Sequence, residues 1–318
     1  MGLLDFLKDT IGIDPGSHHL RITKNGELVF NERSQISFGK ETGIVTGIGD
    51  SIQSGDAHFT NSPVDGTIAD FLGFEKLLSG ALKKGQNSSL FIPRSYKMVF
   101  CIPLGATEID RRAYRDSAEH AGATEVYMIY QSFCAAIGLN ILSEQKHFLI
   151  VDFGSSKIEM SVFVNGLPVS DGVIPMGTSK IFGLIRNVLK RNYKVSVSDA
   201  EIQSLLSDLR RSSDGIRVQH VTVQVDEIHS LLDHFFSIVN DALREVIEGV
   251  SSYSEIGKAL NNGVYFTGGG SAIDILREKI TIDNRIKTTV SNTPLLDNIN
   301  GLKKVIADRD DYTRGLMT

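Results

Sequence analysis

The sequence predicts an α/β protein made of two similar domains. The main observation is a strand–turn–strand pattern that occurs twice: Ile11 to Arg21 reads IGIDPGSHHLR, and Leu149 to Ser161 reads LIVDFGSSKIEMS. Each copy has a β-branched run, an Asp, one further residue, a Gly and a small hydroxyl residue, and then a second apolar segment. An Asn-Gly pair, which favours a tight hairpin, follows each copy at Asn25-Gly26 and Asn165-Gly166. Hairpins that alternate with helices, repeated twice, are typical of a two-domain α/β protein.

Composition is compatible with two packed cores and excludes several other classes. The chain has 318 residues, 41% of them hydrophobic, and a formal net charge of −5. No basic block is present, so a nucleic-acid partner is not expected. Cys101 and Cys134 lie in apolar runs without metal-site spacing, which predicts buried thiols in a reducing compartment. No apolar stretch approaches the roughly 18 residues of a transmembrane helix.

In the first half, hydrophobic periodicity and turn residues predict the elements in order. They are strands at 10–14, 19–24 and 28–31, a polar inserted segment at 31–64, a helix at 71–84, a strand at 98–102, a helix from 107 to 122, a strand at 125–130 and a helix at 133–139. Thr107 and Asp110 form a capping-box pattern at the start of their helix, and Gly122 marks its end.

In the second half, the same reasoning predicts a comparable series. It comprises strands at 147–152 and 158–164, helices at 178–192 and 199–211, a strand at 216–225, a helix at 226–250, a strand at 263–267 and a helix that continues through Lys279.

Two acidic residues, Asp14 and Asp152, stand at the end of a predicted strand just before each repeated turn. In a phosphate site such acids hold Mg²⁺, usually through water molecules. The alternative is that each acid only caps its turn. Their matched context favours the phosphate site.

Small residues around the turns supply backbone and hydroxyl donors for phosphate oxygens. Gly16-Ser17 and Gly154 to Ser156 are these donors, and the Gly268 to Gly270 turn would let a base or ribose approach the backbone. The alternative for the glycine turn is a tight strand-to-helix connection. His18 and His19 either contact phosphate or are solvated turn residues. Lys157 either neutralises phosphate charge, or occupies the phosphate position, or faces solvent.

With these motifs in place, the chain resembles the MreB-type bacterial actins of the actin/Hsp70/sugar-kinase superfamily. The most specific stretch is CIPLGATEIDRRAYRDSAEHAGATEVYMIYQSFCAAIG, Cys101 to Gly138. IGIDPGS and VDFGSSKIEMSV resemble the two phosphate loops, VIPMGTSKIFGLI resembles the segment after them, and NGVYFTGGGSAIDIL resembles the adenosine motif.

The resemblance implies a two-domain actin-like (ribonuclease H-like) fold, with a mixed five-stranded sheet in each domain and small inserted subdomains. Domain I is expected at 9–142 plus about 296–318, with an insert at about 32–64. Domain II is expected at 143–295, with a reduced insert at about 196–226. Only the 14 residues SSDGIRVQHVTVQV join two helices there, where the family has a larger subdomain.

The resemblance also implies a site for ATP or ADP with Mg²⁺. The nucleotide-binding residues that it implies are Asp14, Gly16, Ser17, His18, Asp152, Gly154, Ser155, Ser156, Lys157, Gly177, Thr178, Glu201, Gly268, Gly269 and Gly270. Asp14 and Asp152 would hold the Mg²⁺ through water, and Glu201 would contact the ribose.

Several positions depart from the family pattern. His18, His19 and Leu20 replace small or hydroxyl residues, and Ser155 to Lys157 replace a run of glycines and threonines. Gln131 stands where the family has the glutamate that orients the attacking water. A glutamine can hydrogen-bond water but cannot accept its proton, so hydrolysis should slow by about 10²–10⁴-fold. At most a weak ATPase is expected.

Two apolar segments predict contact with a membrane. Leu3, Leu4, Phe6 and Leu7 share one face of a short N-terminal helix, and Leu90 and Phe91 fall in the family's membrane-inserting loop. Each contact is weak alone but would add up along a filament. The alternatives are a terminal segment packed on protein and the beginning of a core strand.

The sequence therefore predicts an MreB-like protein that forms or joins filaments at the cytoplasmic face of the membrane, with a role in cell shape or scaffolding. Its partners would be further copies of itself, the membrane surface and unidentified cytoskeletal or envelope proteins. One alternative is a nucleotide-independent adaptor of the same fold, which His18, His19 and Lys157 favour. A sugar or small-acid kinase is a second alternative, against which the absence of a further candidate carboxylate argues.

Overall fold

The computed structural model describes residues 9–52, 58–61, 68, 70–85, 96–280, 287–307 and 316–317. The predicted membrane-contacting residues Leu3, Leu4, Phe6, Leu7, Leu90 and Phe91 lie outside this part of the chain. The chain divides into two compact units. Unit 1 comprises Met1–Glu144 and Leu296–Thr318, and unit 2 comprises Gln145–Leu295.

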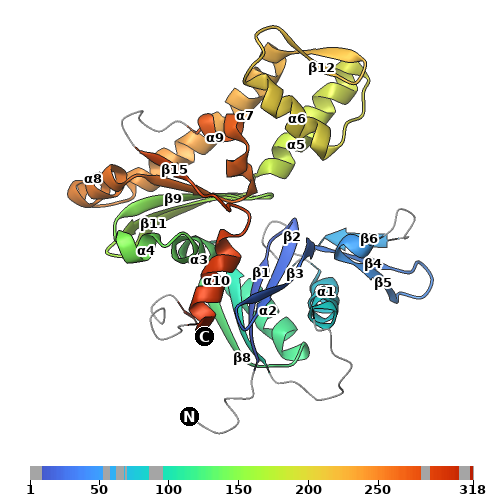
Figure 1. The fold of residues 1–318 in the computed structure, drawn as a ribbon, viewed down its shortest axis with the longest axis vertical. Helices are drawn as coiled ribbons and strands as arrows, with labels where there is room; N and C mark the ends of the chain where they lie inside the picture. The colour runs from blue at the N-terminus through green and yellow to red at the C-terminus, as the bar shows by residue number, and fades with distance from the viewer. Residues whose placement is uncertain are drawn as a thin grey trace. The chain divides into compact units, whose positions relative to one another are not determined.

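Unit 1 is built on a mixed five-stranded sheet (Figure 1). Its strands, in spatial order, are β3 (Glu27–Arg33), β2 (His19–Lys24), β1 (Asp9–Pro15), β7 (Tyr96–Ile102) and β8 (Ala123–Tyr130). The hairpin strands β1, β2 and β3 pair antiparallel, whereas β1, β7 and β8 run parallel. The carboxyl ends of the three parallel strands therefore lie at one edge of the sheet, where open α/β sheets usually place their sites.

Two capped helices cover part of this sheet. The N-cap Asp70 of α1 (Phe71–Lys84) accepts a hydrogen bond from the backbone N–H of Gly73. Helix α2 (Glu108–His120) begins with the predicted capping box of Thr107 and Asp110. The ring of Tyr114 lies 5.6 Å from that of Phe74 and 5.5 Å from that of Phe100, centroid to centroid, which joins α1, α2 and β7 in one core.

A close helix pair joins the two separate sequence segments of unit 1. Helix α10 (Asp297–Ala307) crosses α3 (Gln131–Gly138), which the short α4 (Ile141–Glu144) follows (Figure 1). A Cβ atom at Gly301 would lie 1.9 Å from the carbonyl oxygen of Cys134, so only glycine permits this approach. Lys304 donates to the carbonyl oxygens of Ile137 and Gly138 at 2.9 Å and so caps α3. Burial lowers the pKa of Lys304.

A separate small sheet forms the insert of unit 1. Strands β5 (Val45–Ile48), β4 (Gln35–Phe38) and β6 (His58–Asn61) pair antiparallel in that order, and the 3₁₀ turn Gly49–Ser51 follows β5. All three strands fall within the stretch that composition marked as an inserted subdomain.

Unit 2 repeats the sheet of unit 1 with the same arrangement. The strands in order are β11 (Leu167–Ile174), β10 (Ile158–Val164), β9 (Phe148–Phe153), β14 (Val264–Thr267) and β15 (Thr288–Val290). Again three strands form antiparallel hairpins, and β9, β14 and β15 run parallel. The fold thus contains the duplicated mixed sheets that the repeated motif predicts.

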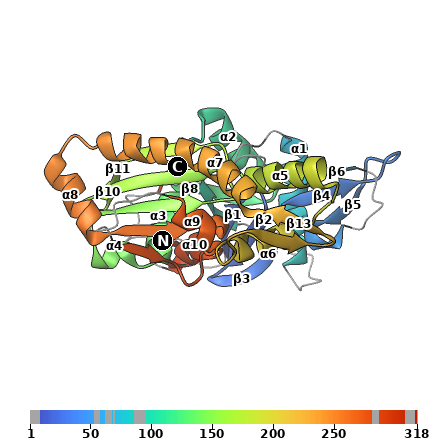
Figure 2. The same ribbon diagram turned by 90° about the horizontal axis from the view of Figure 1, so that it is seen from above.

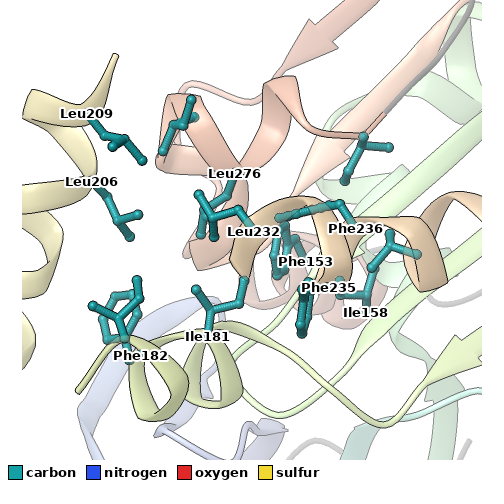
Figure 3. Packing of buried hydrophobic residues seen from close by; sticks show 14 of the residues in the cluster. Phe153, Ile158, Ile181, Phe182, Leu206, Leu209, Leu232, Phe235, Phe236 and Leu276 are labelled. Atoms are coloured by element: carbon teal, nitrogen blue, oxygen red, sulfur yellow. The ribbon is translucent and has the colours of Figure 1, made fainter. Parts of the chain in front are cut away.

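The helices of unit 2 pack around this sheet. They are α5 (Thr178–Val188), which continues as a π-helical turn (Leu189–Tyr193), α6 (Asp199–Leu209), α7 (Val225–Glu248), α8 (Tyr253–Asn262), the 3₁₀ turn Gly269–Ala272 and α9 (Asp274–Glu278). Helix α7 contacts β10 and β11, along which it runs (Figure 2). Phe153 of β9 and Phe235 and Phe236 of α7 belong to one buried cluster with side chains of α5 and α6 (Figure 3).

Two element predictions in unit 2 are corrected by the structure. The predicted single strand at 216–225 is a hairpin of β12 (Gly215–Val218) and β13 (Val221–Gln224). Gln219 adopts a positive φ of 54°, which reverses the chain, and its side-chain amide donates to Ser196 O and to Glu201 Oε1 at 2.9 and 2.8 Å. The helix predicted to reach Lys279 is a 3₁₀ turn followed by the five-residue α9.

Candidate nucleotide-binding site

The first repeated turn joins β1 to β2 and has a tightly determined backbone. A Cβ atom on Gly16 would lie 2.8 Å from the carbonyl oxygen of His19, so glycine permits the narrow turn. Ser34, which directly follows β3, is fully buried and stabilises the turn by two hydrogen bonds. Its hydroxyl donates to Gly16 O, and its backbone N–H donates to His18 O at 3.0 Å. Asp14 and Ser17 therefore occupy fixed backbone positions at the carboxyl end of β1.

A buried cation stands beside the acid of this turn. Asp14 and Arg21 are directly opposite in the β1–β2 register, and Arg21 Nη1 lies 3.3 Å from Asp14 Oδ2. The two side chains are only 10% and 4% exposed. The sequence reasoning did not assign Arg21 a role, although the predicted antiparallel hairpin carried the signal that would have placed it opposite Asp14.

The two histidines of the first turn contact each other. Their Nδ1 atoms lie 2.8 Å apart, so one ring donates to the other. Burial, and then the charge of Arg21, lower the pKa of His19 to about 4. His19 is therefore neutral at neutral pH and adds no positive charge for a phosphate group. His18 is exposed at the tip of the turn.

Gln131 is the first residue of α3 and follows β8 directly. Because β1, β7 and β8 are parallel, the first turn and Gln131 lie at the same edge of the sheet of unit 1. Gln131 is 7% exposed. Its role in orienting water stays a prediction.

In unit 2 the structure brings the second turn together with the start of α5. The N–H of Gly154 donates to Lys157 O at 2.9 Å and closes the turn. The N–H groups of Thr178 and Ser179 donate to the carbonyl oxygens of Gly154 and Ser155 at 3.2 and 2.9 Å. The hydroxyls of Ser155 and Ser179 are 2.6 Å apart. Gly177 is the N-cap, where a Cβ atom would lie 2.5 Å from Gly154 O.

The glycine turn after β14 contacts the second turn as well. Thr267 pairs with Asp152 in the β9–β14 register. Gly268 has a φ of +80°, and a Cβ atom there would lie 2.3 Å from Asp152 Oδ1. Gly269 and Gly270 continue into the 3₁₀ turn, and Gly270 abuts the ring of Phe153. The predicted nucleotide residues of the two strand ends and of α5 are thus neighbours within unit 2.

Glu201 is engaged elsewhere. Its Oε2 accepts hydrogen bonds from the N–H and hydroxyl of Ser198, both at 2.8 Å, and its Oε1 accepts one from Gln219. The backbone hydrogen bond from Ser198 is the main reason that the pKa of Glu201 is lowered. Glu201 therefore caps α6 and ties it to the β12–β13 hairpin, and its contact with a ribose stays a prediction.

The second turn also carries its own cation. Lys157 Nζ lies 2.6 Å from Glu159 Oε1, and the two side chains are 12% and 1% exposed. Lys157 therefore does not face solvent, which was one of the three alternatives that the sequence left open for this residue. Glu159 is opposite Asp152 in the β9–β10 register, as Arg21 is opposite Asp14 in unit 1.

The cations beside the two turns bear on the predicted Mg²⁺. A hydrated Mg²⁺ is held by carboxylates that can reach its water shell. Asp14 is 3% exposed and its oxygen faces a guanidinium, while an ammonium lies within the second turn beside Glu159. A divalent cation beside the guanidinium would be repelled, whereas the ammonium is paired with Glu159 and not with Asp152. The Mg²⁺ that Asp14 and Asp152 would hold through water therefore stays a prediction.

Comparison with solved structures defines the class of fold. The crystal structure of MreB 5 of Spiroplasma citri bound to AMPPNP superposes with a TM-score of 0.82 at 19% identity, covering 96% of this chain and 98% of that one. The MamK double helical filament gives a TM-score of 0.74 at 15% identity over 95% and 99% of the two chains. The fold is therefore actin-like.

Sequence comparison narrows the class to a family. The family model described as MreB/Mbl protein matches residues 8–314. Cell shape-determining protein MreB of Escherichia coli (strain K12) is 29% identical over 247 residues, which are 73% of this chain and 71% of that protein. Cell shape-determining protein Mbl of Bacillus subtilis (strain 168) is 25% identical over 332 residues, covering 94% and 98%. The chain belongs to the MreB/Mbl family, which confirms the resemblance in its motifs.

Proposed function

We propose that this chain binds ATP or ADP, forms or joins filaments, and acts in cell shape or as a scaffold at the cytoplasmic face of the membrane. Its sequence relatives are named cell shape-determining proteins. Its structural relatives include MreB5 of Spiroplasma citri bound to ADP and a MamK filament. These relatives support the proposal, and further copies of the chain are the expected partners.

The observation that carries nucleotide binding is the convergence of three predicted segments in unit 2. Gly177 and Thr178 contact the backbone of Gly154, and Gly268 contacts the carboxylate of Asp152 so closely that neither glycine has room for a Cβ atom. Such close backbone surfaces favour the approach of phosphate and ribose groups. Isothermal titration of the full chain with ATP and with ADP tests this proposal. Absence of heat and of any thermal stabilisation by either nucleotide would contradict it.

The proposed ATP hydrolysis is weak or absent. The supporting observation is Gln131 at the start of α3, because an amide cannot take a proton from the attacking water. A steady-state phosphate-release assay is expected to give turnover near the background. Turnover typical of an active actin that is lost in Gln131→Ala would contradict this part of the proposal.

The proposed membrane association depends on the N-terminal residues 2–8 and on Phe91. Among the described residues, no helix is long and apolar enough to cross a bilayer. Sedimentation with liposomes tests peripheral binding: deletion of residues 2–8 combined with Phe91→Ser is expected to release the protein. Unchanged sedimentation of that variant would show that these residues do not anchor it.

A nucleotide-independent adaptor of the same fold is the second candidate. The ion pairs Arg21–Asp14 and Lys157–Glu159 favour it, because charges satisfied within the protein no longer require a nucleotide complex. The same titration separates the candidates, since an adaptor of this kind would show no binding of ATP or ADP. Mg²⁺ held through water by Asp14 and Asp152 is part of the first proposal, and the same titration repeated in excess EDTA tests it: unchanged affinity for ATP would contradict it.

A further inference from the structure

We propose that Arg277 and its ion-pair partner Asp274 are positioning residues of the glycine turn, which hold it in the form that receives a nucleotide. Both belong to the short helix α9 that follows the turn, and neither is among the residues that the motifs assign to the site. This inference rests on the proposed nucleotide binding and adds two residues that act on the ligand through the turn. All the contacts that carry it lie within unit 2.

The glycine turn has few contacts of its own that fix its conformation. Gly269–Ala272 is a single 3₁₀ turn, and α9 has only five residues. Helices this short are marginal in water, because a few hydrogen bonds do not offset the entropy of ordering the backbone. The N-cap residues, Gly268 and Ile273, have no side-chain oxygen that could accept from the first N–H groups. The turn therefore depends on contacts from other side chains.

Arg277 supplies such a contact. Its Nη1 donates to Ser271 O at 2.8 Å, and its Nη2 donates to Asp274 Oδ1 at 2.7 Å. The Ser271 carbonyl lies near the end of the 3₁₀ turn, where a cationic donor is favourable. Ser271 is fully buried, and its hydroxyl donates to Gly268 O at 2.7 Å. Arg277 is thus connected through Ser271 to Gly268, the residue with the positive φ.

Asp274 orients the guanidinium of Arg277, and a second arginine orients Asp274. The Nη1 of Arg210 on α6 lies 3.0 Å from Asp274 Oδ2, and its Nη2 lies 2.6 Å from Glu278 Oε1. The hydrogen bond from Arg277 is the main reason that the pKa of Asp274 is lowered, so the carboxylate is charged at neutral pH. A single exposed ion pair contributes little, but several charges in a network favour one geometry. The network therefore fixes Arg277 and, through it, the turn.

The position of the turn matters for the proposed ligand. Gly268 has no room for a Cβ atom beside Asp152, so a displaced turn changes both the backbone surface offered to a ribose or base and the position of the acid. Groups that contact a ligand must be held to within about 0.5 Å, which requires supporting side chains behind them. Arg277 and Asp274 have this supporting position.

Titration of the purified full chain with ATP and Mg²⁺ tests the inference. We expect Arg277→Leu to raise the dissociation constant about tenfold or more, and Asp274→Asn to raise it about threefold, since each removes a charged hydrogen-bonding group. Arg244→Leu on α7 is the matched control, because Arg244 also pairs with an acid three residues before it, Asp241, at 2.9 Å. This control should leave the dissociation constant unchanged.

The outcomes separate the inference from the proposed function. Equal affinity of Arg277→Leu and the unaltered protein would overturn the inference while leaving nucleotide binding intact. Absence of binding by the unaltered protein would overturn the proposed nucleotide binding and this inference with it. Arg277→Lys keeps the charge but not the planar fork of donors, so we expect a dissociation constant about threefold above that of the unaltered protein. An unchanged constant in Arg277→Lys would overturn the inference even if Arg277→Leu does not fold.

Hydrogen exchange without nucleotide distinguishes a positioning role from a general loss of stability. The N–H groups of Ser271 and Ile273 donate to Gly268 O and Gly270 O at 3.2 and 3.1 Å. In Arg277→Leu these two amides should exchange faster, whereas the amides of β14 should keep their rates. Unchanged exchange in the turn, or equally accelerated exchange throughout unit 2, would overturn the positioning role.

Discussion

Arg21 and Asp14 form an ion pair beside the first turn. Both side chains are buried, and charges taken out of water are tolerated only when they neutralise each other. The same two residues thus contribute to the stability of unit 1 and determine the charge at its turn. This dual role leads to a prediction that does not require any ligand.

Arg21→Leu should lower the free energy of unfolding of the chain by about 3–5 kcal/mol, because it leaves the Asp14 carboxylate buried without its cation. Lys24→Leu on the same strand removes a more exposed ion pair, with side chains 20% and 26% exposed, and should cost no more than about 1 kcal/mol. Urea unfolding of both variants checks the difference. Equal losses would show that the Arg21–Asp14 pair behaves as a surface ion pair.

His19 should make the stability depend on pH. Its pKa is lowered from 6.5 to about 4 in the folded protein, so between these values the unfolded chain binds a proton that the folded protein does not. Stability is therefore complete above pH 6.5 and falls as the pH decreases toward 4. Urea midpoints measured across this range should fall less in His19→Asn than in the unaltered protein. The control is His234→Asn on the exposed face of α7, and identical pH profiles for all three proteins would contradict the assignment.

At the residue scale, the sequence predicted where the acidic and small residues lie better than it predicted which side chains they contact. The acids Asp14 and Asp152 and the small residues after them lie at the strand ends where the repeated motif placed them. The ion pairs Arg21–Asp14 and Lys157–Glu159 were not predicted. A pattern of residue types shows which strand a charge belongs to, whereas its partner depends on the register of two strands and on burial.

At the scale of elements, the turn after β14 controls the approach of the backbone to Asp152. Gly268 combines a φ of +80° with a ψ of 159°, a conformation essentially restricted to glycine, and contacts the carboxylate of Asp152. The packing of β14 against β9 and the position of the acid are therefore coupled through one residue.

Gly268→Ala should destabilise unit 2 by about 1–3 kcal/mol from backbone strain alone, and the new methyl group should displace Asp152. The matched control is Gly183→Ala in α5, where a Cβ atom meets nothing within 4 Å. Because alanine is the better helix former, this control should raise the stability by roughly 0.5–1 kcal/mol. Thermal unfolding of both variants tests the pair of expectations, and a tolerated Gly268→Ala would contradict the described turn.

Element prediction succeeded where capping and periodicity were strong. Thr107 with Asp110 located α2, and the Asn-Gly pairs located both hairpins. Helices α4, α8 and α10 were not predicted. The α10 helix is stabilised by its contact with α3, where Gly301 meets Cys134, rather than by a strong local signal. The hairpin at 215–224 was predicted as one strand. Its turn residue, Gln219, has a positive φ, which glutamine rarely adopts and which the sequence therefore does not indicate as it would at a glycine or asparagine.

At the scale of the whole molecule, the repeated motif predicted an α/β protein of two similar domains, and the resemblance to MreB-type bacterial actins predicted the actin-like fold and the family. Fold and family are both confirmed. The activity was harder to predict from the sequence. A motif shows which family residues are present in this chain, but it does not show which side chains the substituted residues contact. Only the structure shows Arg21 and Lys157 beside buried carboxylates. The chain thus has the actin-like fold of the MreB/Mbl family and carries a buried ion pair beside each repeated turn.

Filament formation by the full-length protein tests the proposed function most directly. Electron microscopy and pelleting should be carried out without nucleotide and with ATP and Mg²⁺. We predict filaments with ATP and markedly fewer without nucleotide. Filaments that form equally without nucleotide, or a failure to assemble in both conditions, would contradict the proposed function.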